Sequence, residues 1–227
     1  MTETNDERPP SLSDFEGASE AEIAALPPDE RRLVRAERAC WKLDMIAMDL
    51  TTEYQRRAVF DKSDWGDGAW QTEPDLVMWR AKAPPHYRCM VARSFFGSLN
   101  GYVAIPPGHP AHGVVHQRLK HVPSHRGLSF SGHATAEHWV LGFDCGHGFD
   151  IQPASNARLR QVGALPGFMS GDDDGMGEVF RMRYRDLPYV REVVEALAAA
   201  LAKIAADGVL PPEGSGFDDE ETTEREP

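Results

Sequence analysis

Near its start, the sequence contains a segment in which apolar residues recur with the period of an α-helix. The segment follows Pro27 and Pro28, and Asp29 is suited to cap the first turn. No glycine or proline interrupts the run to about Asp49, and the pattern permits an extension through Tyr54 to Phe60. We therefore predict an N-terminal helix. Its apolar stripe consists of Leu33, Ala36, Cys40, Leu43 and Ala47.

A second helical pattern lies in the last third of the chain. Asp186 and Pro188 are suited to the first turn, and Gly208 is placed to end the helix. The alanine-rich stretch 198–206 has high intrinsic helix propensity. We therefore predict a C-terminal helix. Its apolar stripe consists of Val190, Val193, Val194, Leu197, Leu201 and Ile204.

Between the two helices, short runs of β-branched and aromatic residues alternate with turn-forming residues. Residues 87–93 and 100–105 are expected to form a hairpin, 127–131 and 138–145 two further strands, and 177–184 one more. Connections without regular structure are expected at 62–75, 107–126 and 153–176. Strands in the middle with helices at both ends predict an α+β fold. The expected architecture is a small, mainly antiparallel sheet flanked by an N-terminal and a C-terminal helix.

The acidic residues are concentrated at the two ends of the chain. Of the net charge of −12, residues 1–30 contribute −8 and residues 211–227 contribute −6, so the middle carries +2. Both ends are also poor in aliphatic residues. We therefore expect residues 1–20 and 211–227 to be disordered acidic tails. The remaining stretch, 21–210, has the length of a single α+β domain.

Composition and motif content exclude several classes of function. No apolar run is long enough to span a membrane and no secretory signal is present, so a cytoplasmic protein without a membrane partner is expected. Three cysteines without regular spacing argue against a disulfide framework. The near-neutral middle lacks a strong nucleic-acid signature, and no nucleotide cofactor motif occurs. Arg118, Lys120 and Arg126 form a small basic group that hints at an anionic ligand.

Eight of the nine histidines lie between positions 109 and 147. Histidine is the commonest metal ligand in proteins and the usual acid–base group near neutral pH. Within this region the stretch 138–150 is the most informative. If it begins as a strand, alternate residues from Trp139 to Cys145 face the core and Asp144 points the other way. Cys145 then fits a small core residue better than a reactive one.

Beyond this strand, Gly146 and Gly148 permit a tight turn that can bring Asp144, His147 and Asp150 together. Two carboxylates and an imidazole suit a divalent metal such as Zn, Mn or Fe. They also suit a general base oriented by an acid. A structural alternative stays open, in which Asp144 caps the turn by accepting hydrogen bonds from backbone amides and His147 is merely exposed.

A distant imidazole can complete the site. His125 immediately precedes an expected strand, and if that strand pairs with the one ending near Asp144, His125 comes close to His147 or Asp144. His109 lies in a proline-rich loop that could aim its ring inward. The candidate metal ligands are therefore His125, Asp144 and His147, and the candidate catalytic residues are His109 and Asp150.

Several ordered blocks of the sequence resemble a family of uncharacterised proteins found in bacteriophages and prophages. The blocks are NGYVAIPPGHP, HRGLSF and WVLGFDCGHGFD, followed by the segment YRDLPYV that introduces the C-terminal helix. The family has GYVGVPxGHP, HGGLTF and WWFGFDCAHxGD at these places. The resemblance covers about residues 65–205. The positions that it shares with the family are His109, His125, Gly127, Asp144, Cys145, His147 and Asp150.

The chain departs from the family pattern at two places. Arg126 replaces the middle glycine of HGG, which can change the backbone beside His125. Gly146 and Phe149 replace small residues around the CAHxGD block. Because the family has no known activity, the resemblance implies a phage or prophage context and candidate positions, but no reaction.

These observations lead to a metal-dependent hydrolase as the first functional hypothesis. A divalent ion held by His125, Asp144 and His147 would lower the pKa of a bound water towards ~7. The alternative is a non-enzymatic interaction protein that modulates a host protein, which the small size and the lack of a recognised catalytic motif favour. A purely structural metal domain is disfavoured, because structural zinc usually requires cysteine pairs. The sequence does not specify whether the partner is a small molecule or a host protein.

Overall fold

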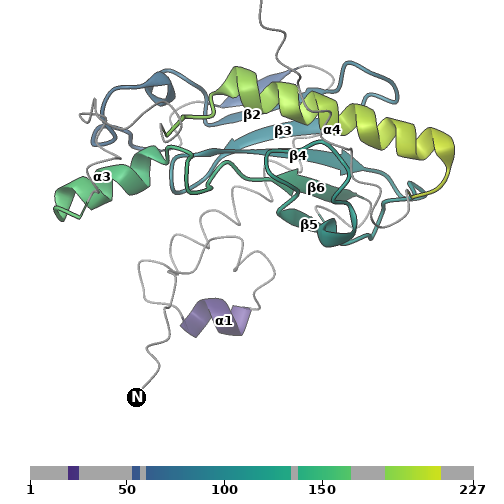
Figure 1. The fold of residues 1–227 in the computed structure, drawn as a ribbon, viewed down its shortest axis with the longest axis horizontal. Coiled ribbons are helices and arrows are strands. Elements are labelled where there is room, and N and C mark those ends of the chain that lie inside the picture. Colours follow the sequence, from purple (N-terminus) through teal and green to yellow (C-terminus); the bar gives the residue numbers. More distant parts are fainter. Residues whose placement is uncertain (1–19, 26–52, 57–59, 134–137, 165–181, 211–227) are drawn as a thin grey trace, which may run out of the picture. The chain divides into compact units, whose positions relative to one another are not determined.

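A computed structural model describes residues 20–25, 53–56, 60–133, 138–164 and 182–210 of the chain (Figure 1). Contacts within the chain divide it into two units, Met1–Leu50 and Thr51–Pro227. In the first unit the described element is the short helix α1 (Glu20–Ala25). The predicted helix at 29–49 lies outside the described residues, as do the predicted acidic tails apart from residue 20.

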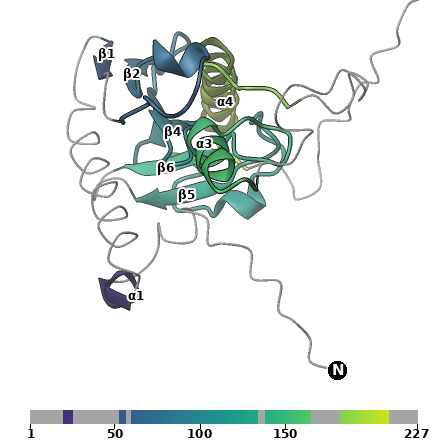
Figure 2. The ribbon, with the colours of Figure 1, turned by 90° about the vertical axis from the view of Figure 1, so that its left-hand side faces the viewer.

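The described part of the second unit contains one six-stranded antiparallel sheet in the order β1-β2-β3-β4-β6-β5; Figure 1 labels β2 to β6, and Figure 2 labels β1. This confirms the predicted α+β class with an antiparallel sheet. In the predicted hairpin of β3 and β4, Arg88 lies opposite Ala104 and Arg93 lies opposite Leu99. The strands are β1 (Tyr54–Arg56), β2 (Leu76–Arg80), β3 (Arg88–Arg93), β4 (Leu99–Ile105), β5 (Phe130–His133) and β6 (Trp139–Phe143).

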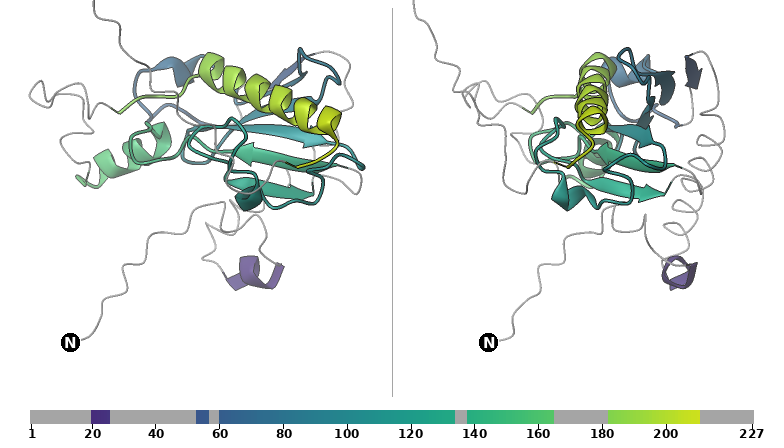
Figure 3. Two further views of the ribbon diagram at one scale, coloured as in Figure 1. Left: turned by 45° about the vertical axis from the view of Figure 1, so that its right-hand side comes forward. Right: turned by 90° about the vertical axis from the view of Figure 1, so that its right-hand side faces the viewer.

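The helix α4 (Leu187–Asp207) covers one face of the sheet by packing on β3 and β4 (Figure 3). The side chain of Asp186 caps its start by accepting a hydrogen bond from Tyr189 N at 3.0 Å, and Gly208 ends it with a left-handed φ of 70°. Both ends agree with the prediction. The residues that it buries are Val190, Val194, Leu197, Ala198, Leu201 and Ile204.

Gly101 sets how closely α4 approaches the sheet. A Cβ atom at this position would come within 2.5 Å of both the Phe143 ring and a Val194 methyl group. Cross-strand apolar residues such as Val103 and Leu141 line the same face and complete the core beneath the helix. Full burial of such a side chain stabilises the fold by about 1.5–3 kcal/mol. The C-terminal helix is therefore fixed firmly against the sheet, and with it the residues at its start.

Two local predictions are wrong, and one strand was not predicted. Tyr54–Arg56 is not a continuation of a helix but the edge strand β1, which pairs with β2. Leu76–Arg80 forms the unpredicted strand β2. Residues 153–161, expected in a loop, form the helix α3 (Pro153–Gln161), which lies at the front of the view in Figure 2. Of the strand expected at 177–184, residues 177–181 lie outside the described part, and Arg183 makes an isolated parallel bridge with Asp150.

Connections between these elements contain two single turns of 3-10 helix, η2 (Ala69–Gln71) and η3 (His116–Arg118). No helix in the described ranges combines the length and hydrophobicity needed to cross a bilayer. As predicted for β6, the side chains of Leu141, Phe143 and Cys145 belong to the core, with Trp139 packed against it. The loop that follows Phe143 therefore leaves the sheet from a rigid, buried position.

Candidate functional site

His125 and Asp150 come from two loops that the pairing of β5 with β6 brings to the same end of the sheet. Phe130 lies opposite Gly142, and one step further Ser129 N donates to Gly142 O at 3.0 Å. The chain that enters β5 and the chain that leaves β6 are therefore neighbours. His125 Nε2 lies 2.7 Å from Asp150 Oδ2, and both side chains are almost completely buried. This confirms the expected strand pairing on which a composite site depends.

Asp150 is the central anion of the site. Its Oδ1 accepts a hydrogen bond from Arg185 Nε at 2.9 Å, and its Oδ2 accepts one from the backbone N of His147 at 3.2 Å. Burial by itself raises the pKa of Asp150, but the hydrogen bonds from His125 and Arg185 outweigh burial and hold this pKa well below its usual range. The carboxylate is therefore ionised at neutral pH.

The second ring nitrogen of His125 extends this arrangement to α4. His125 Nδ1 lies 2.8 Å from the hydroxyl of Tyr189, and the two rings meet edge to face with centroids 5.6 Å apart. The guanidinium of Arg185 lies 4.9 Å from the centroid of the Tyr189 ring. Burial raises the pKa of Tyr189, so its hydroxyl is protonated near neutral pH and can donate to His125. Tyr189, His125 and Asp150 thus form a continuous hydrogen-bond chain.

His147 differs from His125 in lacking a hydrogen-bond partner. Its Nδ1 is buried without one, although it lies 3.4 Å from Asp150 Oδ2. The distance permits an ion pair when the ring is protonated, but the geometry does not form a hydrogen bond. The His147 side chain as a whole is 31 % exposed, and its ring centroid is 5.2 Å from that of His125. Among His125, His147 and Asp150, His147 is therefore the residue that reaches solvent.

One ligand atom from each of His125, His147 and Asp150 lies within 4.8 Å of the other two, a spacing at which the three residues could hold one metal ion. Two imidazoles and a carboxylate suit a divalent transition metal. We refer to His125, His147, Asp150, Arg185 and Tyr189 together as the His125 cluster.

Asp144, predicted as a metal ligand, instead stabilises the turn. Its Oδ1 accepts a hydrogen bond from the backbone N of Gly146 at 2.9 Å and lies 3.9 Å from His147 Nδ1. Its own backbone N donates to Ser129 Oγ at 3.0 Å. Asp144 is not part of the group that could hold a metal. The capping alternative considered for this residue therefore describes its contacts better.

His109, predicted as a catalytic residue, lies away from the cluster. Its Nε2 is 3.0 Å from the carbonyl oxygen of Leu201, and its Nδ1 accepts a hydrogen bond from Ala111 N at 2.9 Å. Leu201 and Tyr189 lie twelve positions apart in α4, which corresponds to about 18 Å along the helix axis. His109 is buried and holds the loop after β4 against the far part of α4. It cannot act on a group bound beside His125.

Cys145 belongs to the core, as the strand pattern indicated. Burial raises the pKa of its thiol, and the nearby charges of Asp150 and Asp144 raise the pKa further. Cys89 is also buried with a raised pKa. Both thiols are therefore poor nucleophiles in the native protein.

We expect iodoacetamide to leave Cys89 and Cys145 unmodified in native protein and to alkylate both fully in denaturant, as measured by peptide mass spectrometry. Native labelling of Cys145 would contradict its place in the core.

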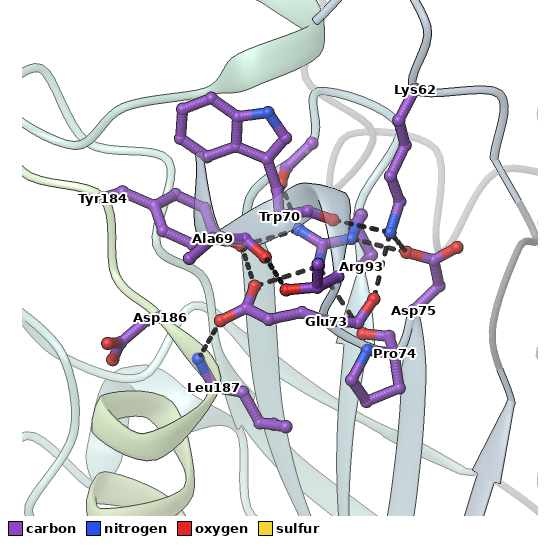
Figure 4. Close-up of polar contacts among 12 residues, drawn as sticks. Lys62, Ala69, Trp70, Glu73, Pro74, Asp75, Arg93, Tyr184, Asp186 and Leu187 are labelled. Carbon is purple, nitrogen blue, oxygen red and sulfur yellow. Dashed lines mark hydrogen bonds and ion pairs between the residues drawn. The ribbon is translucent and has the colours of Figure 1, made fainter. Parts of the chain in front are cut away.

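Sequence reasoning missed Arg185 and Tyr189, and the structure explains how they are positioned. Tyr184, which precedes Arg185, and Leu187, the first residue of α4, are held by a second buried set of charges (Figure 4). Glu73 Oε2 accepts a hydrogen bond from Tyr184 OH at 2.6 Å, and Glu73 Oε1 accepts one from the backbone N of Leu187 at 2.8 Å. A glutamate three residues before β2 therefore fixes the segment that carries two members of the cluster.

Arg93, at the end of β3, holds Glu73 in turn. Its guanidinium donates to Asp75 Oδ1 at 2.7 Å, to Glu73 Oε2 at 3.1 Å and to Tyr184 OH at 2.7 Å, and its side chain has no exposed surface. Lys62 Nζ also lies 2.5 Å from Asp75 Oδ1. We call these five residues, Lys62, Glu73, Asp75, Arg93 and Tyr184, the Arg93 network. Two cations and two carboxylates balance within it, as a buried ionic group requires.

Comparisons of the chain with protein-family models, with curated proteins and with solved structures find no match. The resemblance to phage and prophage proteins stays a prediction. The geometry of the His125 cluster is accordingly the basis for the functional proposal.

Proposed function

We propose that His125, His147 and Asp150 bind a divalent metal ion and that the protein is a metal-dependent hydrolase of phage or prophage type. The observation that carries the proposal is the buried Nδ1 of His147, which has no hydrogen-bond partner and lies 3.4 Å from a carboxylate oxygen shared with His125. A buried polar atom without a partner is costly. A metal ion between the two imidazoles and Asp150 would give this nitrogen its partner.

The surrounding residues suit the support of metal ligands. Tyr189 bonds the ring nitrogen of His125 that faces away from Asp150, which can fix the orientation of the imidazole. Arg185 bonds Asp150 Oδ1 and leaves Oδ2 directed at the imidazoles. Binding would require the proton of His125 to lie on Nδ1, where it can be donated to the Tyr189 hydroxyl, so that Nε2 is free to hold the ion. A bound divalent ion would supply Lewis acidity and an activated water for hydrolysis.

The central test is metal binding by untagged protein and by the variant His147→Ala. We expect the wild type to bind one Zn²⁺ or Mn²⁺ per chain and to melt at a higher temperature with the metal than without it. His147→Ala should weaken binding at least about 100-fold, because one of three ligands is lost. Its metal-free melting temperature should stay within about 2 °C of the wild type, because the side chain is partly exposed and makes no hydrogen bond.

The matched control is His133→Ala, which removes an exposed imidazole of the same histidine-rich region from β5. This variant should bind metal as the wild type does. Isothermal titration calorimetry and elemental analysis measure the binding. A wild-type protein that takes up no Zn²⁺, Mn²⁺ or Fe²⁺ would overturn the metal proposal.

The hydrogen-bond chain from Tyr189 through His125 to Asp150 favours a second candidate, general-base catalysis without a metal. Here Asp150 would stabilise the imidazolium that forms when His125 takes a proton. Hydrolytic activity that resists EDTA but is lost in His125→Gln would select this candidate. The alternative of a non-enzymatic protein that modulates a host protein predicts a co-purifying host protein, no bound metal and no effect of His147→Ala on that interaction.

A further inference from the structure

Arg126, beside His125, adopts a backbone conformation that favours glycine. Its φ is 57°, and the next residue, Gly127, has a φ of 104°. A side chain with a Cβ atom is strained in this left-handed region, and such strain recurs at functional sites. The two consecutive positive φ angles allow His125 to point into the protein while Arg126 is exposed. The strained residue therefore places a cation at the surface directly beside a cluster imidazole.

The side chain of Arg126 bridges the two loops of the site. Its guanidinium lies over the ring of Phe149, 5.7 Å from the centroid, within the range of a cation–π interaction. Phe149 precedes the buried Asp150 in the chain, yet 44 % of its surface is exposed. Arg126 follows His125 directly in the chain, so the guanidinium and the Phe149 ring lie beside two buried members of the cluster. Arg126 and Phe149 thus form one rim of the His125 cluster.

The surface beside this rim is open. A Cβ atom built on Gly127 or on Gly148 would meet no other atom within 4 Å. Both glycines neighbour rim residues, one in each loop. The partly exposed ring of His147 lies between Gly146 and Gly148 and faces solvent on the same loop. The two loops are therefore open to solvent where the exposed imidazole and the guanidinium lie.

The charges of the site select the kind of ligand. Within it, Arg126 and Arg185 balance Asp144 and Asp150. Arg185 is bonded to Asp150, whereas Arg126 has no carboxylate partner in the part of the chain that the structure describes. A divalent ion at the cluster would leave an excess charge of about +2, which a dianion neutralises. A guanidinium is also well suited to bind phosphate oxygens through two parallel hydrogen bonds.

We propose that the substrate is a phosphate ester, with Arg126 binding its phosphoryl oxygens and Phe149 holding the guanidinium over the site. This inference rests on the metal site proposed above. In the reaction, a water oxygen forms a bond to phosphorus and the bond between phosphorus and the ester oxygen breaks. The electron pair of that bond stays on the leaving oxygen, which receives a proton from the water. Arg126 would balance phosphoryl charge throughout.

The test measures binding of orthophosphate to metal-loaded protein by calorimetry, because orthophosphate is a product of monoester hydrolysis. Arg126→Gln should weaken phosphate binding at least about tenfold while metal content is unchanged. Arg126→Lys, which keeps the charge but not the planar fork, should weaken it less. The control is Arg158→Gln, since Arg158 lies 3.9 Å from the centroid of Phe95 in an equivalent pair outside the cluster. This control should bind phosphate as the wild type does.

The experiment distinguishes failure of the phosphate-ester proposal from failure of the metal-site proposal. Metal uptake by the wild type without phosphate binding, or equal phosphate affinity in the wild type and in Arg126→Gln, would overturn the phosphate-ester proposal and leave the metal site intact. Absence of metal uptake would overturn both. Arg126→Gly provides a check on folding, because glycine relieves the strain at φ 57° and should not lower the melting temperature.

Discussion

The variant Asp150→Asn is expected to lose about 3–5 kcal/mol of the free energy of unfolding and to lose metal binding. The substitution removes the carboxylate that Arg185 and His125 both bond inside the protein, and a buried charge without its partner is strongly destabilising. Unfolding in urea, monitored by circular dichroism, measures the change in the free energy of unfolding. Asp144→Asn is the control, because Asp144 is partly exposed and should change stability by about 0.5 kcal/mol or less. A loss below about 1 kcal/mol in Asp150→Asn would contradict the central role of this carboxylate.

The same carboxylate predicts how stability depends on pH. The pKa of Asp150 in the folded protein lies below its value of about 3.9 in the unfolded chain. Ionised Asp150 therefore stabilises the fold above that unfolded value, and the stabilisation is lost as the pH falls through the folded pKa. The difference in stability between the wild type and Asp150→Asn should narrow as the pH is lowered from about 5 towards 2. A difference that is constant over this range would contradict the lowered pKa.

The second large effect is expected for Arg93→Met, which should destabilise the protein by about 3–5 kcal/mol and lower its melting temperature by about 10 °C. Methionine approximates the length of the arginine stem but leaves Asp75 and Glu73 without their shared cation in a buried place. Differential scanning calorimetry measures the change. Because Glu73 also holds Leu187, this variant should weaken metal binding, although Arg93 contacts none of the proposed ligands.

Two further variants make this result interpretable. Arg80→Met removes an exposed guanidinium from β2 whose hydrogen bond to His86 O is 3.5 Å long, and should cost about 0.5 kcal/mol or less. Arg93→Lys keeps the charge and should lose less stability than Arg93→Met, because it retains an ion pair but not the planar set of donors. If Arg93→Met and Arg80→Met were equally stable, the Arg93 network would have no stabilising role.

The sequence predicted the elements whose pattern is local and missed those whose pattern is not. The C-terminal helix had a cap at Asp186, an apolar stripe and a terminating Gly208, and the structure has all three. Strand β2 was missed because four of its five residues are buried, so that side chains on both faces of the sheet are covered. Such a strand lacks the alternation of apolar and polar residues that marks a half-exposed strand. Helix α3 was missed because it has few apolar residues and begins at Pro153 in a segment that resembles a loop.

The same distinction between local and non-local patterns applies to the residues of the candidate site. His147 and Asp150 lie in one short glycine-rich turn, and the paired strands bring His125 to them, so sequence pattern was sufficient. Arg185 and Tyr189 lie 35 and 64 residues from their partners and belong to no motif, so only tertiary structure could reveal them. His109 lies apart from the cluster, because the direction of a loop does not determine which end of the helix its side chain meets.

The six residues from Tyr184 to Tyr189 contribute to both the His125 cluster and the Arg93 network. In the sequence, they come after all the other residues of these two groups. A nascent chain that has emerged from the ribosome only as far as α3 contains His125, His147 and Asp150 but lacks the arginine and the phenol that hold them in place. Closing contacts over 91–114 residues, such as those to Arg93 and Glu73, is entropically expensive and tends to come late in folding. Ligand affinity should therefore develop only after the terminal helix has docked, so partly synthesised protein would be inert.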